Sequence, residues 1–418
     1  MAIPRSRHRS NKAQLRATEN EDVTLRRVQR RTGLWIAAAL TIICFVGLIS
    51  GAAIRGYATS GPQTLTVMTR NIYLGGNINR PIRAALDRTG REGVLALGHA
   101  NHELREVVER TDFAARSKLL AAEIASTRPD LLGLQEVALW RHGPMQLDQI
   151  GRPNATEVDY DFLAMLLADL TDRGLRYQIV HVQQESDVEA PAFTGNPYTG
   201  TAGAAEDVRL TDRDVILVRD DAGIRVDATG GGNFSRRLEV RLGDTTFPFV
   251  RGFAWADIAV GSARIRFITT HLESQSARLA LAQAEELLNG PAGNTGVSTV
   301  IACDCNSNPA SPAARTSLPI GSGGAYRVIT NDHGFTDLWL QAASRADAGN
   351  TGWLSELAND ETADFERRID LVLARSAPSA QLSVSQAELT GDELSDRDPV
   401  TKLWPSDHAG VVVQLQIG

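Results

Sequence analysis

The sequence has 418 residues, of which 43% are hydrophobic and 22% are charged. This composition is typical of a folded globular protein, excludes a fully disordered chain, and leaves room for one large or two ordinary domains. The formal net charge is -7, but residues 1–32 hold nine basic and three acidic residues, a local charge of +6, so the remainder carries -7 - 6 = -13. Because a basic surface is needed to neutralise the phosphates of a long nucleic acid, this acidic body disfavours such a ligand without excluding a nuclease.

The N-terminal part differs in composition from the rest of the chain. Residues 1–33 are polar and arginine-rich, which predicts a disordered tail. Residues 34–54 carry no charge and as a helix would reach roughly 31 Å, enough to cross a bilayer. Because the arginines precede this segment, we expect an uncleaved transmembrane anchor with a cytoplasmic N-terminus and an extracytoplasmic body. A cleaved signal peptide, which would give a secreted protein, and a buried soluble helix are the alternatives. Residues 55–62 read as a linker to a folded domain over 63–418.

From residue 63 onward, apolar runs with strand and helix periodicity alternate. Helical spacing predicts helices over 113–126, 160–170 and 274–288, and a short helix introduced by 334–339. Residues 185–213 and the glycines at 230–232 are expected to form loops. Many antiparallel-looking strands with few helices predict two sheets packed face to face and flanked by helices. The predicted strands are 65–68, 130–134, 177–182, 214–218, 237–242, 253–260, 265–270, 298–302, 369–373, 382–387 and 411–416.

The chain has three cysteines, Cys44, Cys303 and Cys305. Cys44 lies in the apolar segment, and only Asp304 separates the other two, which is too close for an easy unstrained disulfide. We therefore expect a fold that does not depend on disulfides. A zinc site would need two further ligands at a fitting spacing, and none is evident. Two small buried residues on a strand are the favoured interpretation.

The most informative feature is a series of polar residues, each at the end of an apolar, strand-like run. A carboxylate or amide in such a place can face a metal ion, and an imidazole beside it can face a phosphate. Each motif alone is a weak signal, because polar residues at strand ends are usually turns or caps. Six endings that suit one chemistry are a strong signal. They are Asn71, Gln135-Glu136, Thr270-His271-Leu272, Asp304-x-Asn306, Arg368-Ile369-Asp370 and Ser406-Asp407-His408.

This ordered set, spread over about residues 64–418, resembles the endonuclease/exonuclease/phosphatase superfamily. That superfamily includes pancreatic-type deoxyribonucleases, apurinic endonucleases, neutral sphingomyelinases and inositol polyphosphate 5-phosphatases. The resemblance implies an α/β fold, a four-layer α/β/β/α sandwich of two mixed sheets, and Mg²⁺-dependent hydrolysis of phosphate esters. Two departures matter. Cys303 stands where relatives commonly have glycine, and the Trp-x-Gly-Asp-x-Asn and Pro-x-Trp-Cys-Asp patterns of the inositol 5-phosphatases are absent, which argues against that subclass.

The resemblance and the side-chain chemistry suggest the same metal ligands. Mg²⁺ is a hard cation that prefers oxygen and keeps several waters, so it needs few carboxylates. Glu136 is the best candidate, Asn71 offers an amide oxygen and Asp407 a further carboxylate. The ion, Mg²⁺ or alternatively Mn²⁺, would polarise the phosphoryl oxygen and neutralise charge on the leaving oxygen.

The remaining matched positions suit catalysis, and the resemblance assigns them the same roles. Asp304 suits orienting or deprotonating the attacking water, and Asn306 can hydrogen-bond the pentacovalent phosphorus centre. His408, paired with Asp370, would hold one tautomer and a raised pKa, which helps it donate to the phosphate. His271 would supply a second donor to the phosphate oxygens.

Five further polar residues are assigned ordinary structural roles. Arg367 and Arg368 are expected to be solvated, as arginines at strand edges usually are. Asp214 is a possible site residue, with an ion pair as the preferred interpretation. His142 and His181 are expected to be structural.

These expectations combine into a membrane-anchored, metal-dependent phosphoesterase that acts on phosphodiesters or phosphomonoesters. Its context suits a lipid head group or a small phosphodiester, as in sphingomyelinase-like or phospholipase C-like enzymes. An extracytoplasmic nuclease is the alternative within the enzyme class, with nucleic acid as its substrate. An inactive binding module on the same fold is the alternative of another class, although such a module need not retain the whole set of acids, amides and imidazoles.

Overall fold

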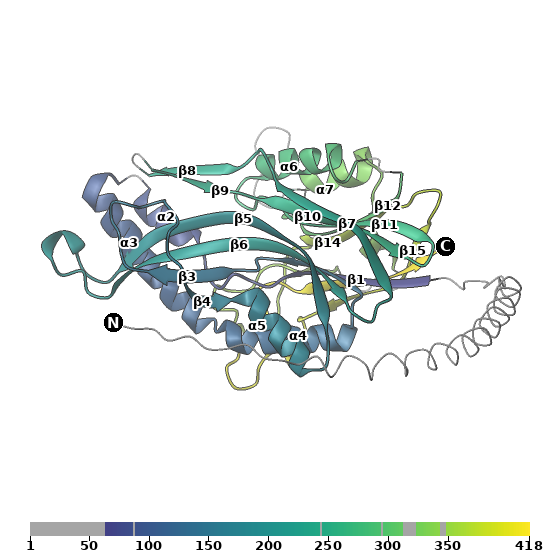
Figure 1. Ribbon diagram of the computed structural model, residues 1–418, viewed down its shortest axis with the longest axis horizontal. Coiled ribbons are helices and arrows are strands. Elements are labelled where there is room, and N and C mark those ends of the chain that lie inside the picture. Colours follow the sequence, from purple (N-terminus) through teal and green to yellow (C-terminus); the bar gives the residue numbers. More distant parts are fainter. Residues whose placement is uncertain (1–62, 87, 243–244, 294–295, 312–322, 343–347) are drawn as a thin grey trace, which may run out of the picture. The chain divides into compact units, whose positions relative to one another are not determined.

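The computed structural model describes residues 63–418, apart from 87, 243–244, 294–295, 312–322 and 343–347 (Figure 1). The expected tail, transmembrane anchor and linker lie outside the described residues. Within the described ranges, no helix combines the length and the apolar character that crossing a membrane requires.

Two mixed sheets form the body of the described chain. The first has eight strands, and β1 and β2 run parallel in it while its other neighbours pair antiparallel. In spatial order it contains β15 (Leu382–Thr390), β16 (Gly410–Ile417), β1 (Gln63–Asn71), β2 (Leu131–Gln135), β6 (Ala205–Arg219), β3 (Leu139–Gly143) and β4 (Glu157–Asp161), with β5 (Tyr177–Phe193) also paired to β6.

The second sheet has six strands, of which β11 and β12 run parallel. A separate two-stranded hairpin, β8 (Leu238–Leu242) and β9 (Thr245–Phe249), comes between two strands of this sheet, β7 and β10, in the chain. In spatial order the second sheet contains β13 (Thr336–Asp337), β14 (Asp370–Arg375), β12 (Ser298–Asp304), β11 (Ala263–His271), β10 (Gly252–Val260) and β7 (Ile224–Asn233).

Helices cover the outer faces of both sheets. Figure 1 shows α4 and α5 on one side of the layers, and α6 and α7 on the opposite side. The helices are α2 (Asn79–Ala85), α3 (Gly90–Arg110), α4 (Phe113–Thr127), α5 (Phe162–Asp172), α6 (Ala277–Asn289), α7 (Gly324–Arg327) and α8 (Leu338–Gln341), with short helical turns at Pro197–Thr199, Val328–Asp332 and Leu394–Asp396.

Three hydrophobic cores separate these layers. Val67 of β1 packs in the core between the two sheets, whereas its neighbour Met68 packs against the helices α4 and α5. This division follows from the strand period of two, because successive side chains point to opposite faces. Ile268 of β11 belongs to the third core, between the second sheet and α6. The protein is therefore a mixed α/β fold with two packed mixed sheets, as predicted.

A glycine lets the two sheets approach closely beneath the site. A Cβ atom placed on Gly133 of β2 would lie 2.7 Å from the Thr269 hydroxyl of β11 and 3.4 Å from the Cβ of Ala302. Any larger residue would have to push the sheets apart. The ends of β2, β11 and β12 therefore meet at one place, immediately beyond this contact.

Two expected loops are strands in the structure. Residues 185–213 belong mostly to β5 and β6, which pair antiparallel over their whole lengths, and only residues 194–204 separate these strands. The glycines at 230–232 lie within β7, paired with β10. Trp255 packs against Gly230, where a Cβ atom would come within 2.6 Å of its ring, so glycine is required there for packing and not for a turn.

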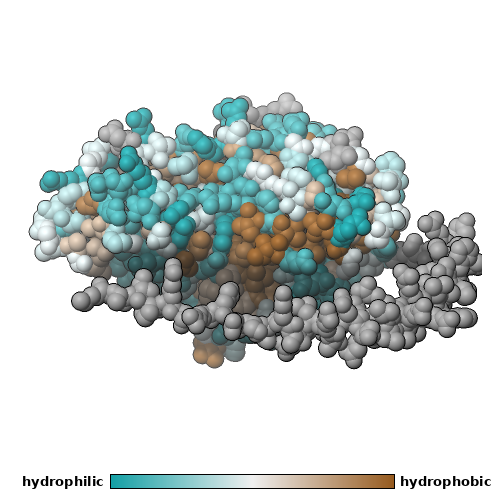
Figure 2. Space-filling model, viewed as in Figure 1, coloured by the Kyte–Doolittle hydropathy of each residue, from teal (hydrophilic) through white to brown (hydrophobic). Residues whose placement is uncertain are grey.

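One face of the domain is predominantly polar. Figure 2 shows this mostly hydrophilic face with a hydrophobic patch near its middle. The strand β5 runs across this face, and its Ile179 and Val182 side chains are 49% and 38% exposed.

Candidate active site

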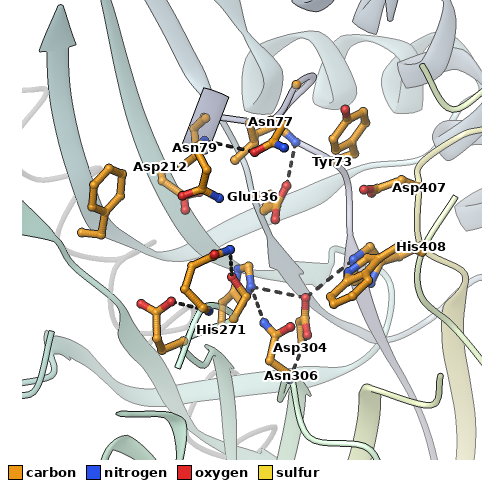
Figure 3. Close-up of a pocket in the computed structure, with 18 of the residues that line it drawn as sticks. Tyr73, Asn77, Asn79, Glu136, Asp212, His271, Asp304, Asn306, Asp407 and His408 are labelled. Carbon is orange, nitrogen blue, oxygen red and sulfur yellow. Dashed lines mark hydrogen bonds and ion pairs between the residues drawn. The ribbon is translucent and has the colours of Figure 1, made fainter. Parts of the chain in front are cut away.

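Six of the eight predicted site residues line one cleft of about 460 Å³, and the other two, Asn71 and Asp370, are buried and hydrogen-bonded to Asp304 and His408 (Figure 3). Glu136 and Asp407 project into it from the first sheet's side, and Asp304 and His271 from the second (Figure 3). The cleft also contains residues that belong to no sequence motif. Its lining includes Tyr73, Ile78, Arg83, Glu136, Asp212, Leu238, Phe249, Arg251, His271, Glu273, Asp304, Asn306, Trp353, Leu354, Glu356, Arg367, Asp407 and His408.

Strand register places three of the polar residues in one row. His271 is the last residue of β11 and pairs with Asp304, the last residue of β12. Asp304 pairs on its other side with Asp370, the first residue of β14. Residues opposite each other on neighbouring strands lie about 5 Å apart, so this register alone concentrates an imidazole and two carboxylates at one sheet edge.

His408 completes the row from the other sheet. Its Nδ1 lies 2.8 Å from Asp370 Oδ2, and its Nε2 lies 3.9 Å from Asp304 Oδ2. Burial alone would lower the pKa of His408, but the carboxylates of Asp370 and Asp304 outweigh it and raise this pKa to about 10. His408 is therefore a cation at neutral pH, with Nδ1–H donating to Asp370 and Nε2–H directed toward the cleft.

His271 has the opposite electrostatic setting. Burial, with the nearby Arg251 guanidinium, holds the pKa of His271 well below its usual range, so the ring is neutral. Arg251 NH1, which can only donate, lies 2.9 Å from His271 Nδ1, and the amide nitrogen of Asn306, also a donor, lies 3.0 Å from His271 Nε2. His271 Nε2 also lies 3.3 Å from Asp304 Oδ2. The two imidazoles thus lie on either side of Asp304, and His408 presents an N–H donor there.

Two hydrogen bonds, from Asn71 and from the backbone of Asn306, hold the Asp304 carboxylate in place. The Asn71 amide donates to Asp304 Oδ2 at 3.0 Å, and the backbone N–H of Asn306 donates to the other carboxylate oxygen at 3.1 Å. Burial and the neighbouring Asp370 raise the pKa of Asp304 to about 7, which suits a group that must accept a proton near neutral pH. Asn306 also donates to the Leu272 carbonyl at 2.9 Å, which fixes its side chain.

Glu136 and Asp407 form an acidic pair across the cleft from this row. Burial raises the pKa of Asp407 to about 7, and the charge of Glu136 adds to the effect. Burial, with the charge of Asp212, likewise raises the pKa of Glu136. A bound cation would relieve this repulsion, so the donor set fits a hard divalent metal.

Unpartnered oxygens support the same fit. Asp212 Oδ1 and Asn306 Oδ1 are buried at the cleft without a hydrogen-bond partner among the described residues. Single atoms of Asp304, Asp370 and His408 also lie within 4.8 Å of one another, but the charged, hydrogen-bonded His408 leaves that group unsuited to a metal. Glu136 and Asp407 would hold the ion, which would supply charge neutralisation at the phosphoryl and leaving oxygens.

Comparison with known proteins agrees with this geometry. The sequence profile of the Endonuclease/Exonuclease/phosphatase family matches residues 100–408. The chain belongs to this family. Its members hydrolyse phosphate esters and are typically metal-dependent, so the protein is a phosphoric ester hydrolase. No curated protein sequence matches the chain.

Several solved structures align with the chain at low sequence identity. A family member from Bacteroides thetaiotaomicron is 15% identical, with a TM-score of 0.49, over 85% of this chain and 98% of its own. A mannosyl-6-phosphatase from the same organism is 15% identical, with a TM-score of 0.47, over 84% of this chain and 99% of its own. Truncated TDP2 from Caenorhabditis elegans is 16% identical, with a TM-score of 0.42, over 84% and 97%.

Asn71, predicted as a metal ligand, is hydrogen-bonded to Asp304. Its amide nitrogen donates to Asp304, and its amide oxygen accepts from the backbone N–H of Tyr73 at 2.9 Å. Its side chain is fully buried. These bonds orient Asp304, and metal binding by Asn71 stays a prediction.

Two fully buried arginines hold the segment that carries Asp407 and His408. Arg70 pairs with Glu123 at 2.9 Å and donates to the backbone carbonyl of His408. Arg116 donates to the carbonyl of Pro405 at 3.1 Å. Because buried carbonyls without a donor are costly, these contacts fix the end of β16 relative to β1 and α4.

The cysteines beside Asp304 contradict the sequence interpretation, since Cys303 and Cys305 form a disulfide. Two residues apart in an extended strand span roughly 6.6 Å, which is at the upper limit for a disulfide. Here the chain bends where β12 ends, and the two Cα atoms are only 5.2 Å apart. The bridge encloses Asp304 and fixes the backbone on both sides of it.

Sequence reasoning missed two cleft residues, Arg251 and Asp212. Arg251 precedes β10, and its guanidinium lies 3.1 Å from Asp212 Oδ2 and beside His271. Neither residue belongs to a motif, and both come from stretches whose pairing is visible only in three dimensions. Because β6 and β10 belong to different sheets, the packing of one sheet on the other brings these residues together, and the sequence does not display it.

The other polar residues divide between the cleft and the scaffold. Arg367 lines the cleft, but Arg368 is 7% exposed and bonds to Asp337 at 2.7 Å, so the prediction of a solvated Arg368 is wrong. Asp214 is fully buried against Glu185 and forms no ion pair with the described residues. His142 lies outside the cleft, 2.7 Å from Asp159.

Proposed function

We propose that this enzyme hydrolyses a small phosphate monoester or diester with the help of Mg²⁺, and that Mn²⁺ can replace it. One observation carries the proposal: His271, Asp304 and His408 face the Glu136–Asp407 pair across one cleft, with Asp370 supporting His408 from behind. This places a base and a charged N–H donor opposite a cation site, which is an arrangement that suits phosphoryl transfer to water.

The residues divide the reaction as follows. Asp304 accepts a proton from the attacking water, whose oxygen forms the new bond to phosphorus. The bond between phosphorus and the leaving oxygen breaks, and the departing alcohol takes up a proton from solvent. Charged His408 donates Nε2–H to the non-bridging oxygens, where negative charge concentrates, and His271 lines the same cleft beside Asp304. Asn306, fixed beside them, adds a further hydrogen bond.

The charge of the cleft supports a small substrate. Its lining includes three arginines, Arg83, Arg251 and Arg367, against six carboxylates, those of Glu136, Asp212, Glu273, Asp304, Glu356 and Asp407. A long nucleic acid would bring many phosphates past these acids with few cations to neutralise them. A single phosphate, neutralised locally by the metal, avoids this cost.

A lipid head group or another small phosphodiester outside the cytoplasm is the substrate class we favour. The charge-free segment 34–54 supports a membrane tether, and the Cys303–Cys305 disulfide supports an oxidising compartment. Protease added to intact cells should then degrade the 63–418 domain and spare the N-terminal tail. Complete protection of the chain in intact cells would refute this placement.

A substrate panel tests the activity itself. The purified protein should hydrolyse bis-p-nitrophenyl phosphate, sphingomyelin or phosphatidylinositol phosphates in Mg²⁺ faster than it cuts plasmid DNA. Preference for plasmid DNA would favour the nuclease alternative. Absence of turnover on every ester, with Mg²⁺ or Mn²⁺, would favour a binding module on the same fold.

A further inference from the structure

Trp353 is the one aromatic side chain of the described residues that is substantially exposed, at 36%. Trp140 and Trp404 are fully buried, and Trp255 and Trp339 pack against the hydrophobic cores. Trp353 instead lines the catalytic cleft. A single exposed apolar residue needs no explanation elsewhere on a surface, but here the indole forms part of the wall of an active site.

The backbone around Trp353 is fixed by hydrogen bonds to the catalytic strands. The Thr351 hydroxyl accepts from the backbone N–H of Asp370 at 3.0 Å, and Gly352 N–H donates to the Arg367 carbonyl at 3.1 Å. On the other side, Leu354 N–H donates to the Asp407 carbonyl at 2.9 Å. The indole is therefore held in place relative to Asp370 and Asp407 before any substrate binds, which lowers the entropy cost of using it.

The indole lies directly beside the phosphate-binding end of the cleft. Its ring centroid is 6.3 Å from that of His408, in an edge-on arrangement. The Arg367 guanidinium stacks on it, 4.8 Å from the ring centroid, and has no carboxylate partner among the described residues. A group attached to a phosphate oxygen near His408 would therefore lie within reach of the indole.

We propose that Trp353 and Arg367 form a stacking subsite for a flat ring carried by the alcohol part of the substrate. The inference rests on the proposed function and narrows it to phosphate esters with an aromatic or heteroaromatic group within one or two bonds of the ester oxygen. A flat ring gains from stacking on an indole and from the adjacent cation, whereas a saturated ring of similar size gains only apolar contact. An apolar part of the lining, formed by Ile78, Leu238 and Phe249, suits either kind of ring.

The test compares two ligands that differ in flatness and little else. Benzylphosphonate and cyclohexylmethylphosphonate are titrated calorimetrically into the full-length protein with Mg²⁺ present. We expect the wild type to bind the benzyl compound about five- to tenfold more tightly. Trp353→Phe should retain most of this preference, and Trp353→Leu should abolish it while binding the cyclohexyl compound as before. Leu394→Ala, which changes a side chain 62% exposed and outside the cleft lining, is the control and should retain the preference.

Kinetics with benzyl and cyclohexylmethyl phosphates, or their methyl diesters, give the second readout. We expect the stacking contact to be equally strong in the bound substrate and in the transition state. Trp353→Leu should therefore raise KM for the benzyl ester about five- to tenfold and leave kcat unchanged. An equal ligand preference in wild type and Trp353→Leu would overturn the subsite, as would a uniform loss for both ligands. If phosphonates bind with the expected preference but no ester is hydrolysed, the proposed function fails and the subsite stands.

Discussion

His408 Nδ1 lies 2.8 Å from Asp370 Oδ2, and both side chains are at most 2% exposed. The carboxylate sets which ring nitrogen faces the cleft and keeps the ring charged. Because the two groups act through one hydrogen bond, their contributions to catalysis cannot be independent.

A double-mutant cycle measures this dependence. His408→Ala should lower kcat by a factor of at least ~10², the range that acid–base and phosphate-positioning groups supply. Asp370→Asn should cost less, because the imidazole remains, and the double mutant should be little worse than His408→Ala. The measurement is kcat/KM for all four proteins, with melting curves beside it. Additive losses that follow lost stability would show that Asp370 and His408 are only structural.

The same pair predicts a shift in the alkaline limit of activity. His408 must be protonated to donate from Nε2, so activity should be lost as pH rises through its pKa of about 10. Asp370→Asn removes the strongest of the charges that raise this pKa, so the limit should move down by roughly 1–3 pH units. Profiles of kcat/KM between pH 6 and 11 check this, and an unmoved limit would contradict the pairing.

Glu136→Gln should impair metal use more than folding. Loss of a carboxylate weakens a site for a hard cation. The glutamine amide has the same shape, and its oxygen can keep the hydrogen bond that Leu74 N–H donates to Glu136 Oε2 at 2.8 Å in the wild type. Activity should fall strongly and recover in part at high Mg²⁺, with a nearly unchanged Tm without metal. Calorimetric Mg²⁺ titration should show the weaker binding directly. Glu106→Gln, on the exposed face of α3, is the control. An unaltered Mg²⁺ affinity in Glu136→Gln would remove this residue from the metal site.

The buried acids Glu185 and Asp214 predict a dependence of stability on pH. Burial raises the pKa of Glu185 to about 8, and burial together with Glu185 raises that of Asp214. The native state thus keeps protons that the unfolded chain has released above about pH 4–5, so stability should fall as pH rises from there to about 8. Asp214→Asn replaces one acid with a permanent donor and should raise stability at pH 8 by roughly 1–3 kcal/mol, with less effect at pH 5. Denaturant unfolding at both pH values measures this.

Asp172→Asn, at the exposed end of α5, is the matched control for Asp214→Asn. It should leave the pH dependence of the wild type unchanged. Asp214→Asn and the wild type could differ in stability by the same amount at pH 5 and pH 8. That result would mean that Glu185 and Asp214 do not share a proton.

Site residues that stand at the ends of apolar strands could be predicted from the sequence. Asn71, Asp304 and His408 each follow or precede a run whose burial is visible in its composition, so their convergence could be predicted. The β5–β6 ribbon could not, because its outer half is polar and is held by ladder hydrogen bonds and by pairs such as Arg209 with Asp187. Such strands show no apolar alternation and were interpreted as a loop.

Helix α3 was also missed, although its Leu97, Leu104 and Val108 have helical spacing. Thr89 and Glu92 have the spacing of a capping box, so a start signal is present in the sequence, although the Thr89 side chain forms no cap hydrogen bond in the structure. Trp353 and Arg251 were not predicted as residues of the site, because they stand in segments without a strand-end motif. Their position depends on contacts with Asp407 and Asp212, residues far away in the sequence.

The position of β16 has a consequence for how the enzyme is made. This strand lies inside the first sheet between β15 and β1, more than 300 residues from β1 in sequence, and His408 lies two residues before it. Contacts of such long sequence separation form late and slowly, and a nascent chain without them exposes the edge of β1. Every other strand must therefore be synthesised before His408 can join the site, so products that end before β16 should be inactive and prone to aggregate.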